Sequence, residues 1–195
     1  NPRHEEILGL KCYPDITSLP PGLDLAILSV PPQAVPPLVR ECAASDVGGC
    51  IINTAGFSET GREEGRRLEE EIREAVTDSG PRLVGPNCMG IYSARGRLAL
   101  FAGMFPMQGR VSVISQSGSL ASITFVTGLE RGLQFEKVVS SGNELDLNCA
   151  DYLEYLAGDD HTEMILAYLE EVRDARRFLE TARGLRGKKP LGIRH

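Results

Sequence analysis

Three short segments combine small residues with polar side chains that can bind or transform a ligand. They are residues 53–57 (Asn-Thr-Ala-Gly-Phe), 85–90 (Gly-Pro-Asn-Cys-Met-Gly) and 115–119 (Ser-Gln-Ser-Gly-Ser). Each follows an apolar run typical of a buried strand. Because ligands of an open parallel sheet bind at the carboxyl ends of its strands, we expect a binding or catalytic site at these turns.

The segment 115–119 carries the clearest chemistry, because a predicted strand there leads into a helix whose first residues are all small. Free backbone N–H groups and the helix dipole at such a start attract an anion that no large side chain obstructs. Ser117 and Ser119 add hydroxyl donors on either side of Gly118. The segment predicts a phosphate site. The alternative is that these small residues only cap the helix and let it pack closely on the sheet.

Cys88 is a candidate nucleophile, because the start of a helix lowers the pKa of a nearby thiol. However, the histidines His4, His161 and His195 stand in contexts that offer Cys88 no evident catalytic partner. We therefore interpret Cys88 as a small turn residue, and His161 as a solvated loop histidine. The dinucleotide, P-loop, nucleophile-elbow and zinc-protease motifs are all absent from the sequence.

The composition narrows the class of protein. The 195 residues are 42% hydrophobic and 25% charged, with a net charge of −6, which excludes a disordered chain and a nucleic-acid binder relying on global charge. No apolar run is long enough to cross a membrane. The five cysteines are odd in number and widely spaced, which favours the reducing cytoplasm over a disulfide or zinc framework. The polar start without Met suggests a processed or incomplete chain.

Alternating strand and helix patterns must position these turns. The expected strands are 23–30, 50–53, 82–85, 110–115, 137–140, 164–169 and 188–193. The expected helices are 33–46, 62–79, 117–131, 148–157 and 174–184, and 91–103 is expected to form a hairpin. In the helix over 117–131, we expect one face to hold Leu120, Ile123, Val126 and Leu129. The alternation predicts parallel sheets in two α/β units, 1–107 and 108–195, with the hairpin as the seam.

Taken together, the motifs resemble one family. The segments at 55–61, 85–90, 109–120, 141–144 and 168–170, in this order, are similar to those of the NDP-forming acyl-CoA synthetases. These are the ADP-forming acetate–CoA ligase type, related to the succinyl-CoA ligase alpha subunit. The resemblance implies a Rossmann-like CoA-binding domain over 1–107, incomplete at its N-terminus. A flavodoxin-like domain over 108–195, incomplete at its C-terminus, would follow it.

The resemblance also implies a reaction. Such ligases join a carboxylic acid to coenzyme A with a nucleoside triphosphate, through an acyl phosphate and a phosphohistidine carried on a mobile loop. Asn1, Pro2 and Arg3 would lie near the CoA phosphates. The residues that would border CoA are Ser29, Val30, Pro31, Asn53, Thr54 and Ala55. Catalytic contributions are implied for Asn87 and Cys88, which with Pro86 would lie where the CoA thiol meets the acyl group.

The same resemblance places the phosphoryl group at the predicted helix start. Ser117, Gly118 and Ser119 would bind it, in agreement with the anion argument above. Glu170 matches the glutamate that partners the phosphohistidine, and Glu171 beside it is the alternative.

Parts of the family pattern are missing from this sequence. The glycine-rich loop is expected upstream of Asn1, and the phosphorylated histidine well beyond His195. The ATP-grasp part that binds ATP or GTP with Mg is also absent, so we expect an ATP-grasp domain or beta subunit as partner and no turnover by this chain alone. A homo-oligomer is compatible with the family, and no nucleic acid or membrane partner is expected. The alternatives are an acyl-CoA-sensing module, such as one fused to a protein lysine acetyltransferase, and a structural domain.

Overall fold

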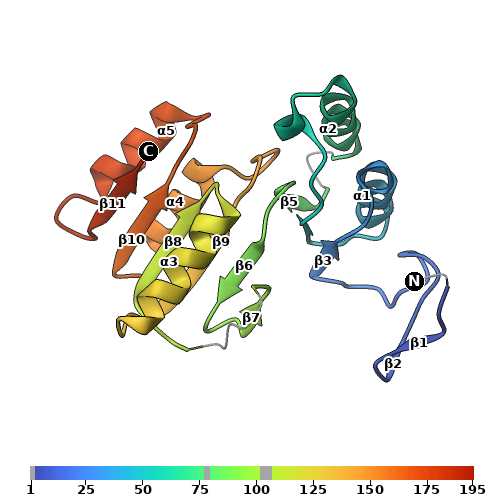
Figure 1. Ribbon diagram of the computed structural model, residues 1–195, viewed down its shortest axis with the longest axis horizontal. Helices are drawn as coiled ribbons and strands as arrows, with labels where there is room; N and C mark the ends of the chain where they lie inside the picture. Colours follow the sequence, from blue (N-terminus) through green and yellow to red (C-terminus); the bar gives the residue numbers. More distant parts are fainter. Residues whose placement is uncertain (1–2, 77–79, 102–106) are drawn as a thin grey trace. The chain divides into compact units, whose positions relative to one another are not determined.

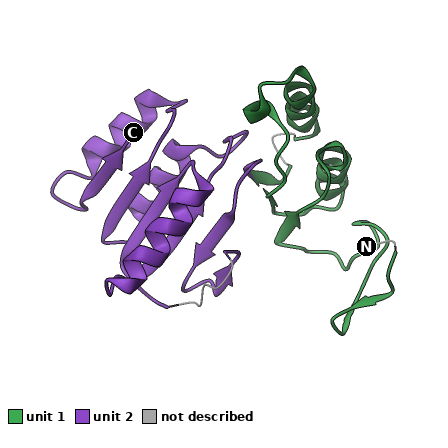
Figure 2. Ribbon diagram, viewed as in Figure 1, with its two compact units in different colours: residues 1–83 green, residues 84–195 purple. Residues whose placement is uncertain are grey.

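The computed structural model describes residues 3–76, 80–101 and 107–195, which form two compact units, Asn1–Leu83 and Val84–His195 (Figure 2). The elements of the first unit are β1 (Glu6–Ile7), β2 (Leu10–Lys11), β3 (Leu25–Leu28), the 3-10 turn η1 (Pro32–Ala34), α1 (Val35–Ala44), β4 (Gly49–Ile52), the 3-10 turn η2 (Ser58–Thr60), α2 (Glu63–Ala75) and β5 (Arg82–Val84), the last ending one residue past the division.

The second unit carries the remaining elements. They are β6 (Gly90–Ser93), β7 (Leu98–Ala99), β8 (Val111–Ser115), α3 (Gly118–Glu130), β9 (Phe135–Ser140), α4 (Cys149–Gly158), β10 (Met164–Tyr168), α5 (Ala175–Gly184) and β11 (Leu191–Arg194) (Figure 1). None of the helices in the described ranges has the length and apolar character needed to cross a bilayer.

Unit 1 is built on a three-stranded sheet in the order β3-β4-β5, in which β3 and β4 are parallel. Cys50, Ile51 and Ile52 of β4 are fully buried because this strand is central, and α1 packs on it through Val39 and Cys42. The sequence did not predict the short antiparallel hairpin of β1 and β2, since each strand has only two residues. The expected helix over 62–79 is confirmed as α2 up to Ala75, and residues 77–79 lie outside the described part.

Unit 2 is a six-stranded sheet in the order β11-β10-β8-β9-β6-β7. The strands β11, β10, β8 and β9 are parallel, as predicted, and β6 and β7 extend the sheet in antiparallel pairing. The hairpin expected at 91–103 is confirmed over β6 and β7, while residues 102–103 lie outside the described part.

Helices cover both faces of the unit 2 sheet (Figure 1). Val113 and Val138 belong to the core cluster beneath α3, while Ile114 and Val139 belong to the cluster beneath α4 and α5. Successive residues of a strand point to opposite faces, so the continuous apolar runs of β8 and β9 supply both clusters. These strands therefore place the turns that follow them together at the carboxyl ends of a sheet that helices cover on both faces.

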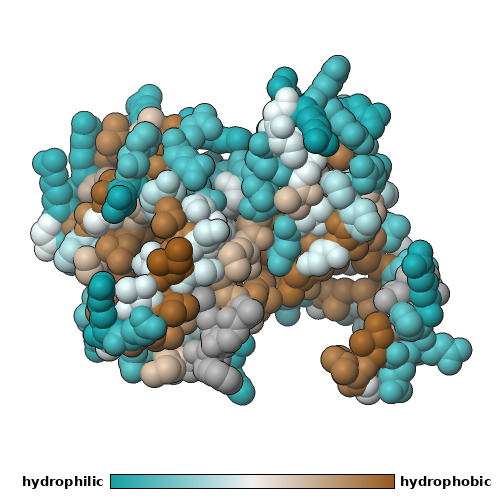
Figure 3. Space-filling view, viewed as in Figure 1, coloured by the Kyte–Doolittle hydropathy of each residue, from teal (hydrophilic) through white to brown (hydrophobic). Residues whose placement is uncertain are grey.

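The predicted face of α3 is wrong. Ala121, Phe125 and Gly128 face the sheet, whereas Ile123 and Val126 are 59% and 52% exposed. In Figure 3, apolar (brown) side chains gather on the surface where Figure 1 draws α3. The error arose because the helix is apolar on more than one side, so apolar spacing alone could not identify the buried face.

The domain boundary predicted after residue 107 stays a prediction. The compact units divide earlier, between Leu83 and Val84, because β6 pairs with β9 and thereby joins the second sheet. The stretch that we interpreted as a seam is thus part of the packing of unit 2.

Candidate functional site

In unit 1, the turns after β3 and β4 are joined by one side chain. The Thr54 hydroxyl accepts a hydrogen bond from the Val30 N–H (3.2 Å) and donates one to the Val30 carbonyl (2.7 Å). The Asn53 N–H continues the ladder to the Leu28 carbonyl (3.0 Å). Two of the predicted CoA-binding segments, 29–31 and 53–55, are therefore held side by side at the carboxyl ends of parallel strands.

Asn53 carries a buried side-chain oxygen that is available as an acceptor. Its side-chain oxygen Oδ1 is buried, and no hydrogen-bond donor reaches it from the part of the chain that the structure describes. Buried polar atoms in proteins are normally paired, so this oxygen is an acceptor suited to a ligand. Arg3 is exposed, while Asn1 and Pro2 lie outside the described residues.

The segment 55–61 is a tightly bonded turn. The Glu59 carboxylate accepts from the N–H groups of Gly56 (2.6 Å) and Phe57 (3.1 Å). The buried carboxylate of Glu69 accepts from the Ser58 N–H and hydroxyl. The segment therefore serves to shape the turn next to Ala55, which itself remains exposed.

In unit 2, the segment 85–90 lies against the turn that follows β9. The Asn143 N–H donates to the Pro86 carbonyl (2.9 Å), and the Asn87 amide donates to the Asn143 side-chain oxygen (3.3 Å). The Met89 N–H donates to the Ser140 hydroxyl (3.0 Å). These bonds fix Pro86 and Asn87 at the edge of the sheet where β8, β9 and β10 end.

The helix that would have activated Cys88 does not exist, because the chain continues into strand β6 at Gly90. The thiol is 5% exposed and lies 3.8 Å from the Val84 carbonyl, to which it donates. The interpretation of Cys88 as a small turn residue agrees with this packing, and the helix-based argument for a nucleophile is wrong.

The start of α3 shows the two features of the alternative interpretation, a helix cap and close packing, while the phosphate site stays a prediction. Ser117 caps the helix, its hydroxyl accepting from the Leu120 N–H (3.3 Å), and the Ser115 hydroxyl donates to the Ser117 carbonyl (2.7 Å). A Cβ added at Gly118 would lie 2.7 Å from Met89 Cγ, so a larger residue there would have to displace the Met89 side chain. Ser119 is exposed.

Open space also lies beside this helix. A cavity of about 600 Å³ extends between α3 and the ends of β10 and β11, and its lining includes Ser115, Leu120, Tyr168 and His195. His195 is thus placed on the same face of the sheet as the start of α3.

Glu170 lies next to Gln116, which comes two residues before α3 begins at Gly118. The Gln116 side-chain oxygen Oε1 accepts from the N–H groups of Glu170 (2.5 Å) and Glu171 (2.9 Å). Both glutamates are exposed. An ion pair between Glu170 and the nearby Arg173 would give this carboxylate a purely structural role. Instead, the Arg173 guanidinium donates to the Glu144 carbonyl (3.0 Å).

Sequence reasoning missed Glu144, which ends the 141–144 motif. Its side chain is 2% exposed, accepts from the Ser141 hydroxyl (2.8 Å), and keeps one oxygen, Oε2, without a donor among the described residues. Burial raises the pKa of this carboxyl, against the opposing effects of Ser141, Gln116 and Arg173. A left-handed backbone at Glu144 (φ 53°) turns it inward, which no pattern in the sequence signals.

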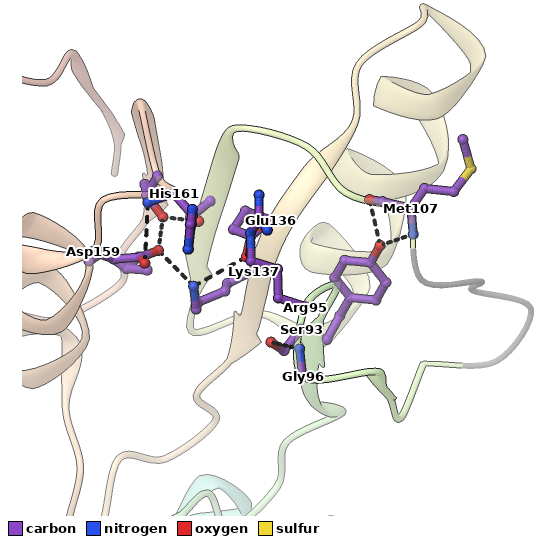
Figure 4. A network of polar contacts seen from close by, with 12 residues as sticks. Ser93, Arg95, Gly96, Met107, Glu136, Lys137, Asp159 and His161 are labelled. Carbon is purple, nitrogen blue, oxygen red and sulfur yellow. Dashed lines mark hydrogen bonds and ion pairs between the residues drawn. The ribbon is translucent and has the colours of Figure 1, made fainter.

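A second polar cluster lies at the amino ends of the unit 2 strands, opposite the carboxyl ends described above (Figure 4). The Lys137 ammonium lies 2.6 Å from Asp159 and 3.5 Å from the fully buried Glu136, which also faces Arg95 at 3.4 Å. Burial would raise the pKa of Asp159, but hydrogen bonds from Lys137 and Thr162 lower it overall. His161 is exposed at the rim, as expected. We interpret this cluster as structural.

Replacing Lys137 with methionine should lower the free energy of unfolding by about 2 kcal/mol at pH 7, because buried carboxylates lose their cation. Because the pKa of Asp159 is lower in the folded protein, its ionised carboxylate stabilises the fold at any pH above the ordinary aspartate pKa near 3.9. This stabilisation is lost as the pH falls through the pKa of Asp159 in the folded protein. The variant and the parent should therefore converge in acid. Urea unfolding from pH 7 downward, with the exposed Lys188→Met as control, measures this. An equal loss at every pH would contradict it.

Comparison with known proteins identifies the class of protein. Residues 1–94 match a family described as "CoA binding domain", and residues 108–193 match "Succinyl-CoA ligase like flavodoxin domain". The fold is therefore a CoA-binding domain followed by a succinyl-CoA-ligase-type flavodoxin-like domain.

Curated relatives and solved structures narrow the class further. The chain is 42% identical over 99% of its length to acetate–CoA ligase [ADP-forming] I of Archaeoglobus fulgidus, covering 28% of that protein. It is 40% identical over 98% of its length to the alpha subunit of acetate–CoA ligase [ADP-forming] II of Pyrococcus furiosus, covering 42% of it. The dinucleotide-forming acetyl-coenzyme A synthetase 1 of Ca. Korarchaeum cryptofilum, solved with phosphate and ADP, superposes with a TM-score of 0.90 at 34% identity, over 99% of this chain and 42% of that one.

The chain belongs to the NDP-forming acyl-CoA synthetases of the acetate–CoA ligase type. It spans less than half the length of each of these relatives.

Proposed function

We propose that this chain is the CoA- and phosphoryl-binding part of an acid–CoA ligase. The ligase would form acyl-CoA from a carboxylic acid, CoA and a nucleoside triphosphate, through an acyl phosphate and a phosphohistidine. The observation that carries the proposal is the convergence, at one edge of the unit 2 sheet, of the small-residue start of α3 and the backbone of Glu170.

The physical argument starts from charge. A carboxylate beside an anion-binding helix start opposes phosphate binding, because like charges repel. The same arrangement is useful when an imidazole lies between them. The Glu170 carboxylate then accepts a hydrogen bond from one ring nitrogen, and the other nitrogen carries the phosphoryl group to the N–H groups of residues 117–119.

The remaining roles follow the family. We assign CoA to Arg3, to residues 29–31 and to residues 53–55, with the buried Asn53 oxygen as the acceptor that best supports the assignment. Pro86, Asn87 and Cys88 would border the reacting thioester, with Cys88 as a packing residue and not a nucleophile. ATP or GTP with Mg would bind to an ATP-grasp domain or beta subunit, the partner that the name of an alpha-subunit relative suggests. The five free thiols support a cytoplasmic location.

The test is product formation from acetate, CoA, ATP and Mg²⁺, measured with the purified chain alone and with the chain joined to its ATP-grasp part. We expect no turnover from the chain alone, because its sequence shows neither an ATP-grasp motif nor a histidine in the family's context. The joined form should produce acetyl-CoA and ADP. If the joined form binds CoA but makes no acyl-CoA from any short carboxylic acid, the ligase proposal fails.

A further inference from the structure

We infer that Gln116 is a positioning residue, whose side-chain amide fixes the backbone from which the Glu170 carboxylate projects. The functional half of this inference rests on the role proposed above for Glu170. The structural half rests on contacts within unit 2.

The amide of Gln116 makes three hydrogen bonds to one short segment. Its oxygen accepts from the N–H groups of both Glu170 (2.5 Å) and Glu171 (2.9 Å), and its Nε2 donates to the Glu171 carbonyl (2.7 Å). The main chain of Gln116 also donates to the Tyr168 carbonyl (3.2 Å). One residue thus holds the segment 168–171 by both its backbone and its side chain.

The position of these bonds explains why they are needed. The parallel pairing of β8 with β10 ends at Ser115 and Tyr168, after which one chain turns into α3 and the other toward α5. The N–H groups of residues 170 and 171 would then lack a strand partner. A side-chain amide has the donor and acceptor chemistry of a peptide group, so Gln116 extends the ladder where the strands separate.

The buried carboxyl of Glu144 is a further partner of Gln116. The Glu144 carboxyl interacts with the Gln116 amide, and its main-chain carbonyl accepts from Arg173 (3.0 Å). The segment 170–173 is therefore tied at its start by Gln116 and at its end through Arg173. An exposed carboxylate on a loop gains from such anchoring, because a misplacement of about 1 Å costs about a hundredfold in rate.

The structural half is tested on the isolated chain by measuring amide hydrogen exchange with NMR. Gln116→Met keeps the length of the side chain and removes its hydrogen bonds. We expect exchange at Glu170 and Glu171 to accelerate at least about tenfold, with no change at core amides such as Ile114 and Ile165. Gln134→Met, an exposed glutamine at the opposite edge of the sheet, is the matched control. Unchanged exchange at residues 170 and 171 would overturn the inference.

The functional half is tested on the ligase. Gln116→Met should lower kcat about 30- to 100-fold and leave the KM for CoA within about twofold, because the loss concerns a group that acts on the phosphoryl carrier. If Glu170→Gln abolishes turnover but Gln116→Met leaves it unchanged, the inference fails while the proposed function stands. If Glu170→Gln has no effect, the proposed role of Glu170 fails, and the exchange result still decides whether Gln116 anchors the segment.

A pH profile separates positioning from mere folding. The charged groups that face this position are Glu144 from the turn after β9, and Glu170, Glu171 and Arg173 from the segment after β10. In Gln116→Glu, the ionised side chain is repelled by the carboxylates of Glu144, Glu170 and Glu171. The protonated side chain has the shape of glutamine and offers an O–H donor in place of the amide N–H. Relative to the parent, this variant should regain kcat as the pH is lowered, whereas Gln116→Met stays low throughout. Parallel profiles for the two variants would contradict the inference.

Discussion

Glu170→Gln should reduce acyl-CoA formation by the assembled ligase by about a thousandfold or more. Glutamine keeps the size of the side chain but removes the charge that orients an imidazole and stabilises its cationic form. The corresponding loss of an orienting carboxylate in serine proteases costs about 10⁴ in kcat. Initial rates of acetyl-CoA formation at saturating CoA and ATP provide the measurement.

The matched control is Glu180→Gln. Glu180 lies on the exposed face of α5, where it pairs with Arg176 (3.0 Å), so this variant changes the net charge equally without touching the carboxyl edge of the sheet. Its rate should stay within about twofold of the parent, since exposed ion pairs contribute little. If Glu170→Gln retains more than about a tenth of the rate, the assignment is wrong, and the same test on Glu171 decides whether its neighbour holds the role.

Gly142→Ala should destabilise unit 2 by about 3 kcal/mol or more. A Cβ at this position would lie 2.2 Å from the Pro86 carbonyl oxygen and 2.7 Å from that of Asn87. Both contacts are with backbone, which has no side-chain freedom to yield. The added methyl group would force apart the 85–90 and 141–144 segments, which are joined by the hydrogen bond from Asn143 to Pro86.

A second glycine separates this overlap from backbone strain. Gly187 has a left-handed φ of 73°, close to the 61° of Gly142, but an added Cβ there would meet nothing within 4 Å. Gly187→Ala should therefore cost only the conformational strain, about 1 kcal/mol. Urea denaturation of both variants measures the difference. Equal losses would show that the close approach at Gly142 is not what requires glycine.

Much of the fold was predictable, because buried strands and amphipathic helices leave local patterns. The apolar run at 110–115 became β8, and the charged, periodic stretch at 62–79 became α2. Prediction failed where a choice depended on distant partners. The exposed face of α3 looks as apolar as its buried face, and the pairing of β6 with β9 follows from the sheet as a whole.

Part of the candidate site could likewise be predicted from the sequence, and part of it could not. Small residues at 117–119 predicted a helix start, which is confirmed as α3 with Ser117 as its cap, while the binding of an anion there stays a prediction. In contrast, the clamp of Gln116 on Glu170 and the inward turn of Glu144 are contacts between segments far apart in sequence. Gln116 lies within the segment 115–119, but only the three-dimensional arrangement shows which groups its side-chain amide contacts.

Titration of the isolated, ¹⁵N-labelled chain with inorganic phosphate tests the central claim most directly, since that claim concerns the start of α3 and the carboxylate beside it. We predict shifts at the amides of Ser117, Gly118 and Ser119 that chloride at equal ionic strength does not reproduce. We also predict that Glu170→Gln binds phosphate about fivefold more tightly, because removing a like charge at close range is worth about 1 kcal/mol in water. The same variant should be the one that loses turnover. Phosphate shifts confined to other residues, or equal phosphate affinity in the parent and in Glu170→Gln, would contradict this account.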